Sequence, residues 1–310
     1  MPIFRLEDDK LIIAQETTVE LEQHIEIWLE NSPWAVIQDE LFLWIDRQPS
    51  AQDEEGTIFP DLLGVDSEGN LAIVEFKRGK TPRTVVAQVL EYAAWADELP
   101  PEQIHDLADA YFEKREEFRG KTFSEAFREV FDIPETYELP PLKRKLRLFV
   151  IAEEIQPRVG HVCRFLRRSC KMDVSCIAVS KFQTESGEEI VSTETKVGDE
   201  EIVTPKTRQQ RTSPPSRWSG NNLEQEQVVW EAVKEFTSGD PNATFAPADI
   251  DKAVENRYSD FPVYTVRRWI RGGCVNFPKR SDYPIGEDRY WWIKTGIYRL
   301  YDSEKDKMKE

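Results

Sequence analysis

The sequence predicts an α/β protein with a mixed central sheet flanked by helices, followed by a small C-terminal α+β domain. Over residues 1–182, short apolar runs alternate with amphipathic stretches, which is the pattern of a layered α/β unit. A polar stretch follows at residues 183–222. In residues 223–310, three helical patterns precede two short aromatic-rich strands. We therefore expect two domains joined by a linker.

The elements of the first domain follow from spacing and from turn residues. Thr81 suits an N-cap and Pro82 suits a first helical residue, so a helix is expected from there to about Leu99, before two prolines. The polar turn 66–70 joins two strands into a hairpin. The expected helices cover residues 18–29, 81–99, 102–131 (an acidic insert) and 159–171, and the expected strands cover residues 41–45, 57–65, 71–77, 146–152 and 174–179.

The second domain has the order of a winged helix, a variant of the helix-turn-helix. Residues 183–222 are polar and poor in aromatic side chains, so we expect a flexible linker with an edge hairpin at 189–192 and 201–204. Three helices, 227–236, 247–258 and 265–271, are followed by strands at 290–293 and 296–300.

Charge and composition narrow the functional classes. The net charge is −17, and most of the excess acid lies in the first domain, which argues against a general nucleic-acid coat. No apolar run is long enough for a membrane helix, and the acidic N-terminus lacks the apolar core of a secretory signal. The four cysteines show no metal-binding spacing. We expect free thiols, a cytoplasmic location and no membrane partner.

Three residues of the predicted hairpin carry the strongest chemical signal. Glu75 and Lys77 are two positions apart on one strand, so they point to the same face, and the hairpin brings Asp61 beside them. Two carboxylates suit a hard divalent cation, and a neighbouring lysine can hold or deprotonate an attacking water. The alternative is a buried ion pair that only orders the sheet.

Nearby helices supply further candidates. Gln88 and Tyr92 are four residues apart on the helix that follows Lys77, so they share one face. Glu22 and Glu26 are likewise four apart on the first helix, and either acid could supply a further metal ligand. A solvent-facing Gln88 and a Tyr92 at the core boundary are the structural alternative.

These residues together resemble the core of RecB-like PD-(D/E)xK nucleases. The similarity is greatest to the branch-specific and mismatch endonuclease group (NucS/EndoMS-like). It covers about residues 15–182, through Phe59-Pro-Asp61, Gly69-Asn-Leu-Ala-Ile-Val-Glu75-Phe-Lys77 and Gln88-Val-Leu-Glu-Tyr92. The resemblance implies a restriction-endonuclease-like fold and Mg²⁺- or Mn²⁺-dependent hydrolysis of DNA, in defence or repair. The chain lacks that group's N-terminal dimerisation domain, so mismatch specificity is not carried over and a homodimer stays open.

The resemblance also implies residue roles. Asp61 and Glu75 correspond to the metal-binding carboxylates, the Phe76 carbonyl to a further ligand, and Lys77 to the catalytic lysine. Gln88 and Tyr92 match the family's Gln-x-x-x-Tyr element. The helix acid falls on Glu22, with Glu26 as the alternative.

Basic side chains outside this cluster suggest contacts with DNA phosphates. Arg78, Lys80 and Arg83 precede the helix that carries Gln88, and a helix N-terminus itself favours phosphate. Further clusters lie at residues 143–147 and 164–168, where a phosphate-facing rim and a solvated charged face are both open. In the predicted recognition helix, Arg267, Arg268 and Arg271 are candidates for DNA contacts, and protein binding by this domain is the alternative. A non-catalytic scaffold on a nuclease fold, or cleavage of RNA, also stays open.

Overall fold

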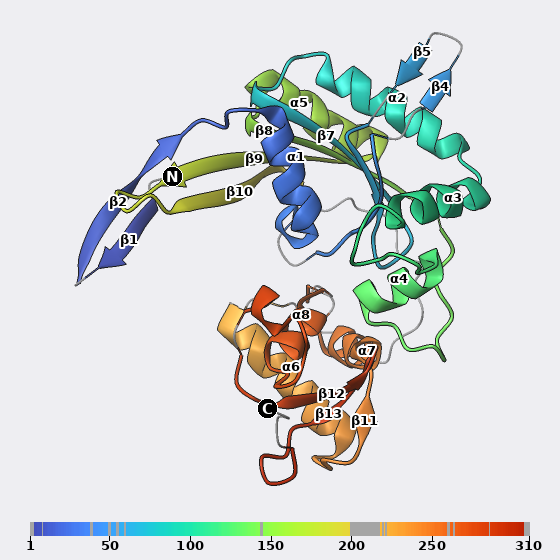
Figure 1. Cartoon of the computed structure of the whole chain (residues 1–310), viewed down its shortest axis with the longest axis vertical. Coiled ribbons are helices and arrows are strands. Elements are labelled where there is room, and N and C mark those ends of the chain that lie inside the picture. The colour runs from blue at the N-terminus through green and yellow to red at the C-terminus, as the bar shows by residue number, and fades with distance from the viewer. Residues whose placement is uncertain are drawn as a thin grey trace. The chain divides into compact units, whose positions relative to one another are not determined.

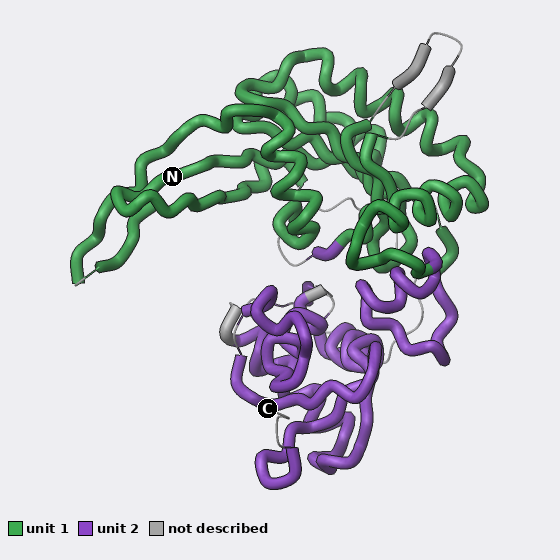
Figure 2. The backbone as a smooth tube through the Cα atoms, viewed as in Figure 1, with its two compact units in different colours: residues 1–38, 42–121, 140–206 green, residues 39–41, 122–139, 207–310 purple. Residues whose placement is uncertain are grey.

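In the computed structural model the chain folds into two compact units (Figure 2). Unit 1 comprises residues 1–38, 42–121 and 140–206, and unit 2 comprises residues 39–41, 122–139 and 207–310. The described residues are 3–7, 9–37, 40–48, 51–53, 56–58, 60–142, 145–198, 218, 220, 222–258, 261–262, 264–284 and 286–306.

Unit 1 is built on one large mixed sheet with helices packed against it (Figure 1). Its strands are β1 (Ile3–Glu7), β2 (Lys10–Thr17), β3 (Leu43–Arg47), β6 (Leu62–Val65), β7 (Leu71–Lys80), β8 (Leu146–Glu154), β9 (Asp173–Gln183) and β10 (Glu189–Val197), and a separate pair is formed by β4 (Ala51–Asp53) and β5 (Gly56–Ile58). Its helices are α1 (Glu22–Asn31), α2 (Val85–Glu98), α3 (Pro101–Phe112) and α5 (Pro157–Phe165), with short turns η1 (Pro33–Ala35) and η2 (Leu166–Cys170).

The strand order of the sheet is β1-β2-β9-β8-β7-β6-β3, and β10 pairs with β9. β7, β8 and β9 run parallel, while the remaining pairs of this sheet are antiparallel. Parallel neighbours require crossover connections, and the helices between these strands provide them. Residues 71–76 of β7 are all buried, as expected for a central strand covered on both faces. The predicted mixed α/β sheet with flanking helices is therefore present.

Several boundaries differ from the sequence expectations. α2 begins at Val85, because the backbone N–H of Thr81 donates to Glu154 and its buried hydroxyl accepts from Gln156, which keeps Thr81 beside β8 instead of capping a helix. The expected strand 57–65 is divided at Pro60, so Asp61 stands just before β6. β10 forms a nine-residue strand inside the expected linker. The expected hairpin strand 201–204 lies outside the described residues.

The C-terminal part of unit 2, from residue 222, contains three α-helices and a small antiparallel sheet among its described residues. The helices are α6 (Asn222–Thr237), α7 (Pro247–Arg257) and α8 (Tyr264–Gly272), and the sheet has the order β11 (Thr244–Phe245), β13 (Ile297–Leu300), β12 (Tyr290–Lys294), with a short turn η3 (Arg280–Asp282) before it. Their apolar side chains form one core, which includes Val229, Val266, Ile270, Tyr290 and Tyr298.

Residues 122–139 also belong to unit 2, although the sequence analysis placed 102–131 as an insert of the first domain. This segment contains α4 (Phe123–Phe131), which begins with a capping box formed by Thr122 and Glu125. Asp132 then adopts a left-handed conformation (φ 56°), and its buried carboxylate accepts hydrogen bonds from the Gly296 N–H and the Tyr298 hydroxyl. Arg271 lies 3.5 Å from the same carboxylate. Polar groups far apart in sequence thus attach α4 to unit 2.

Among the described residues, no helix combines the length and the apolar composition needed to cross a lipid bilayer.

Candidate functional site

The strongest candidate site lies on β7, beside the start of β6. The Asp61 backbone N–H donates to the Val74 carbonyl at 3.2 Å, and its carboxylate accepts from the Phe76 N–H at 2.7 Å. Glu75 and Lys77 follow on one face of β7, and their side chains form an ion pair of 2.5 Å. The structure therefore brings Asp61, Glu75 and Lys77 together, as the hairpin pattern predicts.

Burial makes this cluster electrostatically unusual. Glu75 is 2% exposed. Burial, followed by the charge of Glu75, raises the pKa of Asp61 to about 8, although the Phe76 N–H opposes that rise. Burial also raises the pKa of Glu75, against the opposing effects of Lys77 and Tyr92. Burial lowers the pKa of Lys77, but Glu75, Glu22 and Asp61 outweigh burial, so it stays above its ordinary value.

Helix α1 places Glu22 at this site. One Glu22 oxygen accepts from the Arg78 N–H at 2.6 Å, and the other lies 3.8 Å from the Lys77 ammonium. Glu26 instead forms an ion pair of 2.8 Å with Arg47 on β3. Of the two acids that the sequence left open, Glu22 therefore contacts the lysine, while Glu26 is engaged by Arg47.

Glu30, one turn further along α1, belongs to the same charged group as Glu26. Its carboxylate lies 3.3 Å from Arg47 and 3.3 Å from Arg115, and it accepts from the Tyr111 hydroxyl at 2.6 Å. Arg47 thus bridges two buried acids of one helix, which fixes the face of α1 that packs on the sheet.

Helix α2 contributes Tyr92 to the site. Tyr92 is buried, and its phenol lies close enough to Glu75 to lower the pKa of that carboxyl. Burial, followed by the charges of Glu75 and Asp61, raises the pKa of the Tyr92 phenol. Gln88 is half-buried one turn earlier on the same helix. The side chain of Tyr92 therefore reaches the acid pair, and Gln88 lies on the turn beside it.

The edge of β7 beyond its pairing with β6 is bound by carboxylates instead of by a strand. The backbone N–H groups of Phe76 and Arg78, two residues apart on this edge, donate to Asp61 and Glu22. The Gly79 N–H, where the pairing of β7 with β8 is irregular, donates to Glu153 of β8 at 2.7 Å. The carbonyl of a strand residue points to the same side as its N–H, so the Phe76 carbonyl lies on this edge as well.

Glu153 is a further residue of this site, and the sequence patterns did not predict it. Its second oxygen accepts from the Val19 N–H at 2.7 Å, so one carboxylate connects the segment before α1 to the end of β7. A signal was present, because Glu153 follows the apolar run of a parallel strand, and the carboxyl ends of parallel strands are where α/β sites form.

The carboxylate oxygens of this site meet some of the requirements for binding a divalent cation. Glu75 Oε2 is buried and has no hydrogen-bond partner among the described residues, and the adjacent Asp61 is another buried acid. Two repelling carboxylates with an unused oxygen favour a bound cation, and Mg²⁺ often uses one or two carboxylates with water completing its shell. However, the described residues include no group of three or more Asp, Glu, His or Cys side chains arranged to hold a metal.

Basic side chains near the site are accessible. Arg78, Lys80 and Arg83 are all exposed, and Lys80 lies 3.2 Å from Glu154 in an exposed ion pair. Such pairs are weak and exchange readily with other partners. These three residues are available for contacts with an anionic ligand.

The arginines of α8 are placed differently from the sequence expectation. Arg271 is 4% exposed and donates to the Tyr283 hydroxyl at 2.6 Å and to the Val130 carbonyl at 3.1 Å. Arg267 is mostly buried, 3.7 Å from Asp251, and Arg268 lies over the Trp269 ring. The expectation of a DNA contact is wrong for Arg271, because its guanidinium is enclosed within unit 2.

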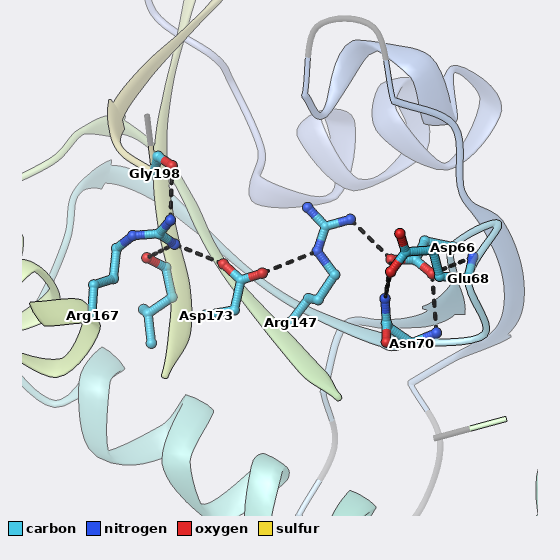
Figure 3. Close-up of polar contacts among 8 residues, drawn as sticks. Asp66, Glu68, Asn70, Arg147, Arg167, Asp173 and Gly198 are labelled. Atoms are coloured by element: carbon cyan, nitrogen blue, oxygen red, sulfur yellow. Dashed lines mark hydrogen bonds and ion pairs between the residues drawn. The ribbon is translucent and has the colours of Figure 1, made fainter. Parts of the chain in front are cut away.

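Two basic residues of the predicted phosphate rim are also internal. Arg147 connects Asp66 at 3.1 Å to Asp173 at 3.3 Å, and Arg167 binds Asp173 at 2.6 Å (Figure 3). Arg167 also donates to the Gly198 carbonyl. This chain of ion pairs lies where β7, β8 and β9 begin, at the opposite ends of these strands from Lys77. It orders the sheet and is not a phosphate-binding surface.

Comparison with known proteins gives one match. Residues 227–300 match the model of a domain of unknown function, DUF7669. This region holds most of α6 and the remaining helices and sheet of unit 2, without the segment 122–139. No curated protein and no solved structure matches the chain.

Proposed function

We propose that the chain is a metal-dependent phosphodiesterase that cleaves DNA at the site formed by Asp61, Glu75, Lys77 and Glu22. The observation that carries this proposal is the buried Glu75, which has one oxygen 2.5 Å from Lys77 and the other without a partner among the described residues. A lone structural ion pair would not need a second buried carboxylate beside it, because that acid adds repulsion.

Asp61, Glu75 and the Phe76 carbonyl would hold the cation, which supplies positive charge against the phosphate and lowers the pKa of a bound water. Mg²⁺ and Mn²⁺ both prefer such oxygen ligands. The chain's own residues do the positioning. The Phe76 N–H holds one oxygen of Asp61, and Tyr92 polarises Glu75.

Lys77 is the group best placed to act on the substrate. Its ammonium group lies between Glu75 and Glu22, so it is positioned before any substrate arrives. There it can donate a hydrogen bond to the attacking water or to a phosphate oxygen as negative charge develops. Gln88, one turn before Tyr92, is available for a second polar contact.

Substrate binding would begin with phosphate contacts. Arg78, Lys80 and Arg83 provide exposed positive charge beside the site, on a chain of net charge −17. Among the arginines of α8, Arg267 and Arg268 are both partly exposed and stay candidates for a DNA contact. We propose that unit 2 is a winged-helix-like module that binds DNA or protein.

The test is hydrolysis of single-stranded, double-stranded, branched and mismatched DNA, with RNA beside them, in Mg²⁺ or Mn²⁺. Lys77→Ala, Glu75→Gln and Asp61→Asn should each lower the cleavage rate by about 100-fold or more. Lys196→Ala is the matched control, since that exposed lysine on β10 pairs with Glu194, outside the acid cluster and the basic residues beside it.

Equal rates for the wild type and the three site variants would refute the proposal. DNA binding without cleavage would favour the alternative, a non-catalytic scaffold on this fold. Preferential cleavage of RNA would support the same catalytic site, with RNA instead of DNA as the substrate.

A further inference from the structure

Helix α5 and the turn η2 that continues it form a strongly basic segment. Residues 155–172 contain five arginine or lysine side chains and no acidic one, in a protein whose net charge is −17. The two elements run without a break from Pro157 to Cys170, and they pack against β9 and beside α2 (Figure 1). An anion that approaches this acidic chain is therefore attracted to this segment more than to most of the surface.

Two of these five cations bond to the sheet and three do not. Arg164 and Arg167 donate to backbone carbonyls of the neighbouring strands β10 and β9. Arg158, Arg168 and Lys171 are exposed instead, and none of the three forms an ion pair within the described part of the chain. The protein therefore leaves their charge available to a ligand.

The exposed cations share one face of the helix with apolar side chains. At the three- and four-residue spacing of a helix face, the exposed residues are Arg158, His161, Val162, Phe165 and Arg168. Val162 is 41% exposed and Phe165 is 52% exposed. An exposed aromatic ring between cations is the pattern of proteins that bind single strands, because a base stacks on the ring while the phosphates contact the cations. The bases of a duplex stack on one another, so they leave such a ring without a partner.

This basic face begins next to the candidate site. β8 pairs with β7 at Lys77↔Ala152, and α5 begins shortly after the end of β8. The Gln156 N–H, just before the helix, donates to the Thr81 hydroxyl, just after the end of β7. The first turn of α5 is therefore held at the end of the strand that carries Lys77. From there, at about 1.5 Å per residue, the helix carries its exposed face about 15 Å away.

We propose that the outer face of α5 and η2 binds the single-stranded part of the nucleic-acid substrate, along a path that leads away from the candidate site. This inference rests on the proposed function and narrows its substrate class to DNA with a single-stranded segment. Arg158, Arg168 and Lys171 contact phosphates, and Phe165 stacks on a base. An anionic membrane also attracts basic helices, but it requires a broad apolar face, and here Val162 and Phe165 supply the exposed apolar surface.

Fluorescence anisotropy of a labelled oligothymidylate of about 20 nucleotides, without a divalent metal, tests this proposal independently of cleavage. Phe165→Ala should weaken binding by about 10-fold through lost stacking, with the salt dependence unchanged. The double variant Arg158→Ser plus Arg168→Ser loses two phosphate contacts, so the slope of log K against log[salt] should decrease in magnitude by about 1.4. All three positions are exposed, and circular dichroism would verify the folds. Lys10→Ser plus Arg119→Ser, at exposed positions elsewhere in unit 1, changes the net charge equally and is the matched control.

A duplex of the same length should bind about 10-fold more weakly than the single strand. Equal affinity for both, or site variants that bind like the control, would overturn the proposal. Binding to phosphatidylserine vesicles without binding to the oligonucleotide would overturn it as well. An oligouridylate that binds as tightly would support the same surface, with RNA in place of DNA. If the variants lose single-strand binding but the wild type cleaves nothing in Mg²⁺ or Mn²⁺, the proposed catalysis fails and the binding face stands.

Discussion

The Glu22 carboxylate on α1 accepts a 2.6 Å hydrogen bond from the backbone N–H of Arg78, one residue past Lys77. This bond connects a helix to the end of a strand more than fifty residues away. It also holds the second Glu22 oxygen near the Lys77 ammonium. The position of the helix acid is therefore set by the backbone of the strand that carries the lysine.

Glu22→Gln and Glu26→Gln should separate activity from stability. Glu22→Gln removes a charge beside Lys77 and should lower DNA cleavage by about 10-fold or more. Glu26→Gln weakens the pair with Arg47 and should lower the free energy of unfolding by about 1–2 kcal/mol, with a smaller effect on rate. Cleavage kinetics and urea unfolding of both variants check this. The reverse pattern would assign the site acid to Glu26.

Glu153→Gln tests a positioning role. Glutamine has one acceptor oxygen, so it can keep only one of the bonds to Val19 and Gly79. The end of β7 should then loosen, lowering kcat by about 10-fold while KM changes little. Glu154→Gln is the control, since the side chain of that neighbour forms an exposed ion pair with Lys80 and takes no part in the bonds to Val19 and Gly79. A shift in KM alone would indicate a role in substrate binding instead.

Asp132→Asn should destabilise unit 2. The change removes the charge that faces the buried Arg271, and an uncompensated buried guanidinium costs about 3–5 kcal/mol. Thermal unfolding and limited proteolysis of the full chain would measure this loss. Glu135→Gln, an exposed acid of the same segment, should leave the melting temperature unchanged. An unaffected melting temperature in Asp132→Asn would mean that the segment is held by its apolar contacts alone.

Unit 2 should also lose stability as pH rises. Burial raises the pKa of Asp251 to about 7, although Arg267 lowers it, and Glu255 raises it further. The folded state therefore binds this proton more tightly than the unfolded state. The stabilisation is complete below the ordinary pKa of 3.8 and is lost as pH rises through about 7.

Melting temperatures of the wild type and Asp251→Asn at about pH 4.5 and about pH 7.5 isolate this effect. Asparagine does not titrate. The difference in free energy of unfolding between the two proteins, obtained from the melting curves, should therefore change by about 2–4 kcal/mol across that interval. A difference that is independent of pH would contradict the raised pKa. Comparison with the wild type removes the contributions of the other acids.

Local patterns predicted the part of the site that lies on one hairpin. Glu75 and Lys77 share a face because strand periodicity requires it, and the turn 66–70 brings Asp61 close. The choice between Glu22 and Glu26 was not local, because it depends on Arg47 and on the Arg78 backbone. Spacing along a helix cannot supply those partners.

The misassigned residues have distant partners. Arg271 carries the pattern of a recognition helix, but the carboxylate and carbonyls that enclose it come from residues 129–132, about 140 positions earlier. Arg147 pairs with Asp66 in the turn before β7, and both Arg147 and Arg167 pair with Asp173 at the start of β9. In each case, the charge of the side chain predicted exposure to solvent. An ion-pair partner far away in the sequence keeps the side chain buried instead.

The segment 122–139 has a consequence for how the chain responds to being cut. In sequence it lies between α3 and β8, which both belong to unit 1, yet it packs with α8 and β13 in unit 2. A site-specific protease sequence inserted between β10 and α6 would divide the polypeptide into two pieces. Those pieces should still migrate together on a sizing column, since the first retains α4 and Asp132. Cleavage there would sever the backbone without releasing the C-terminal piece.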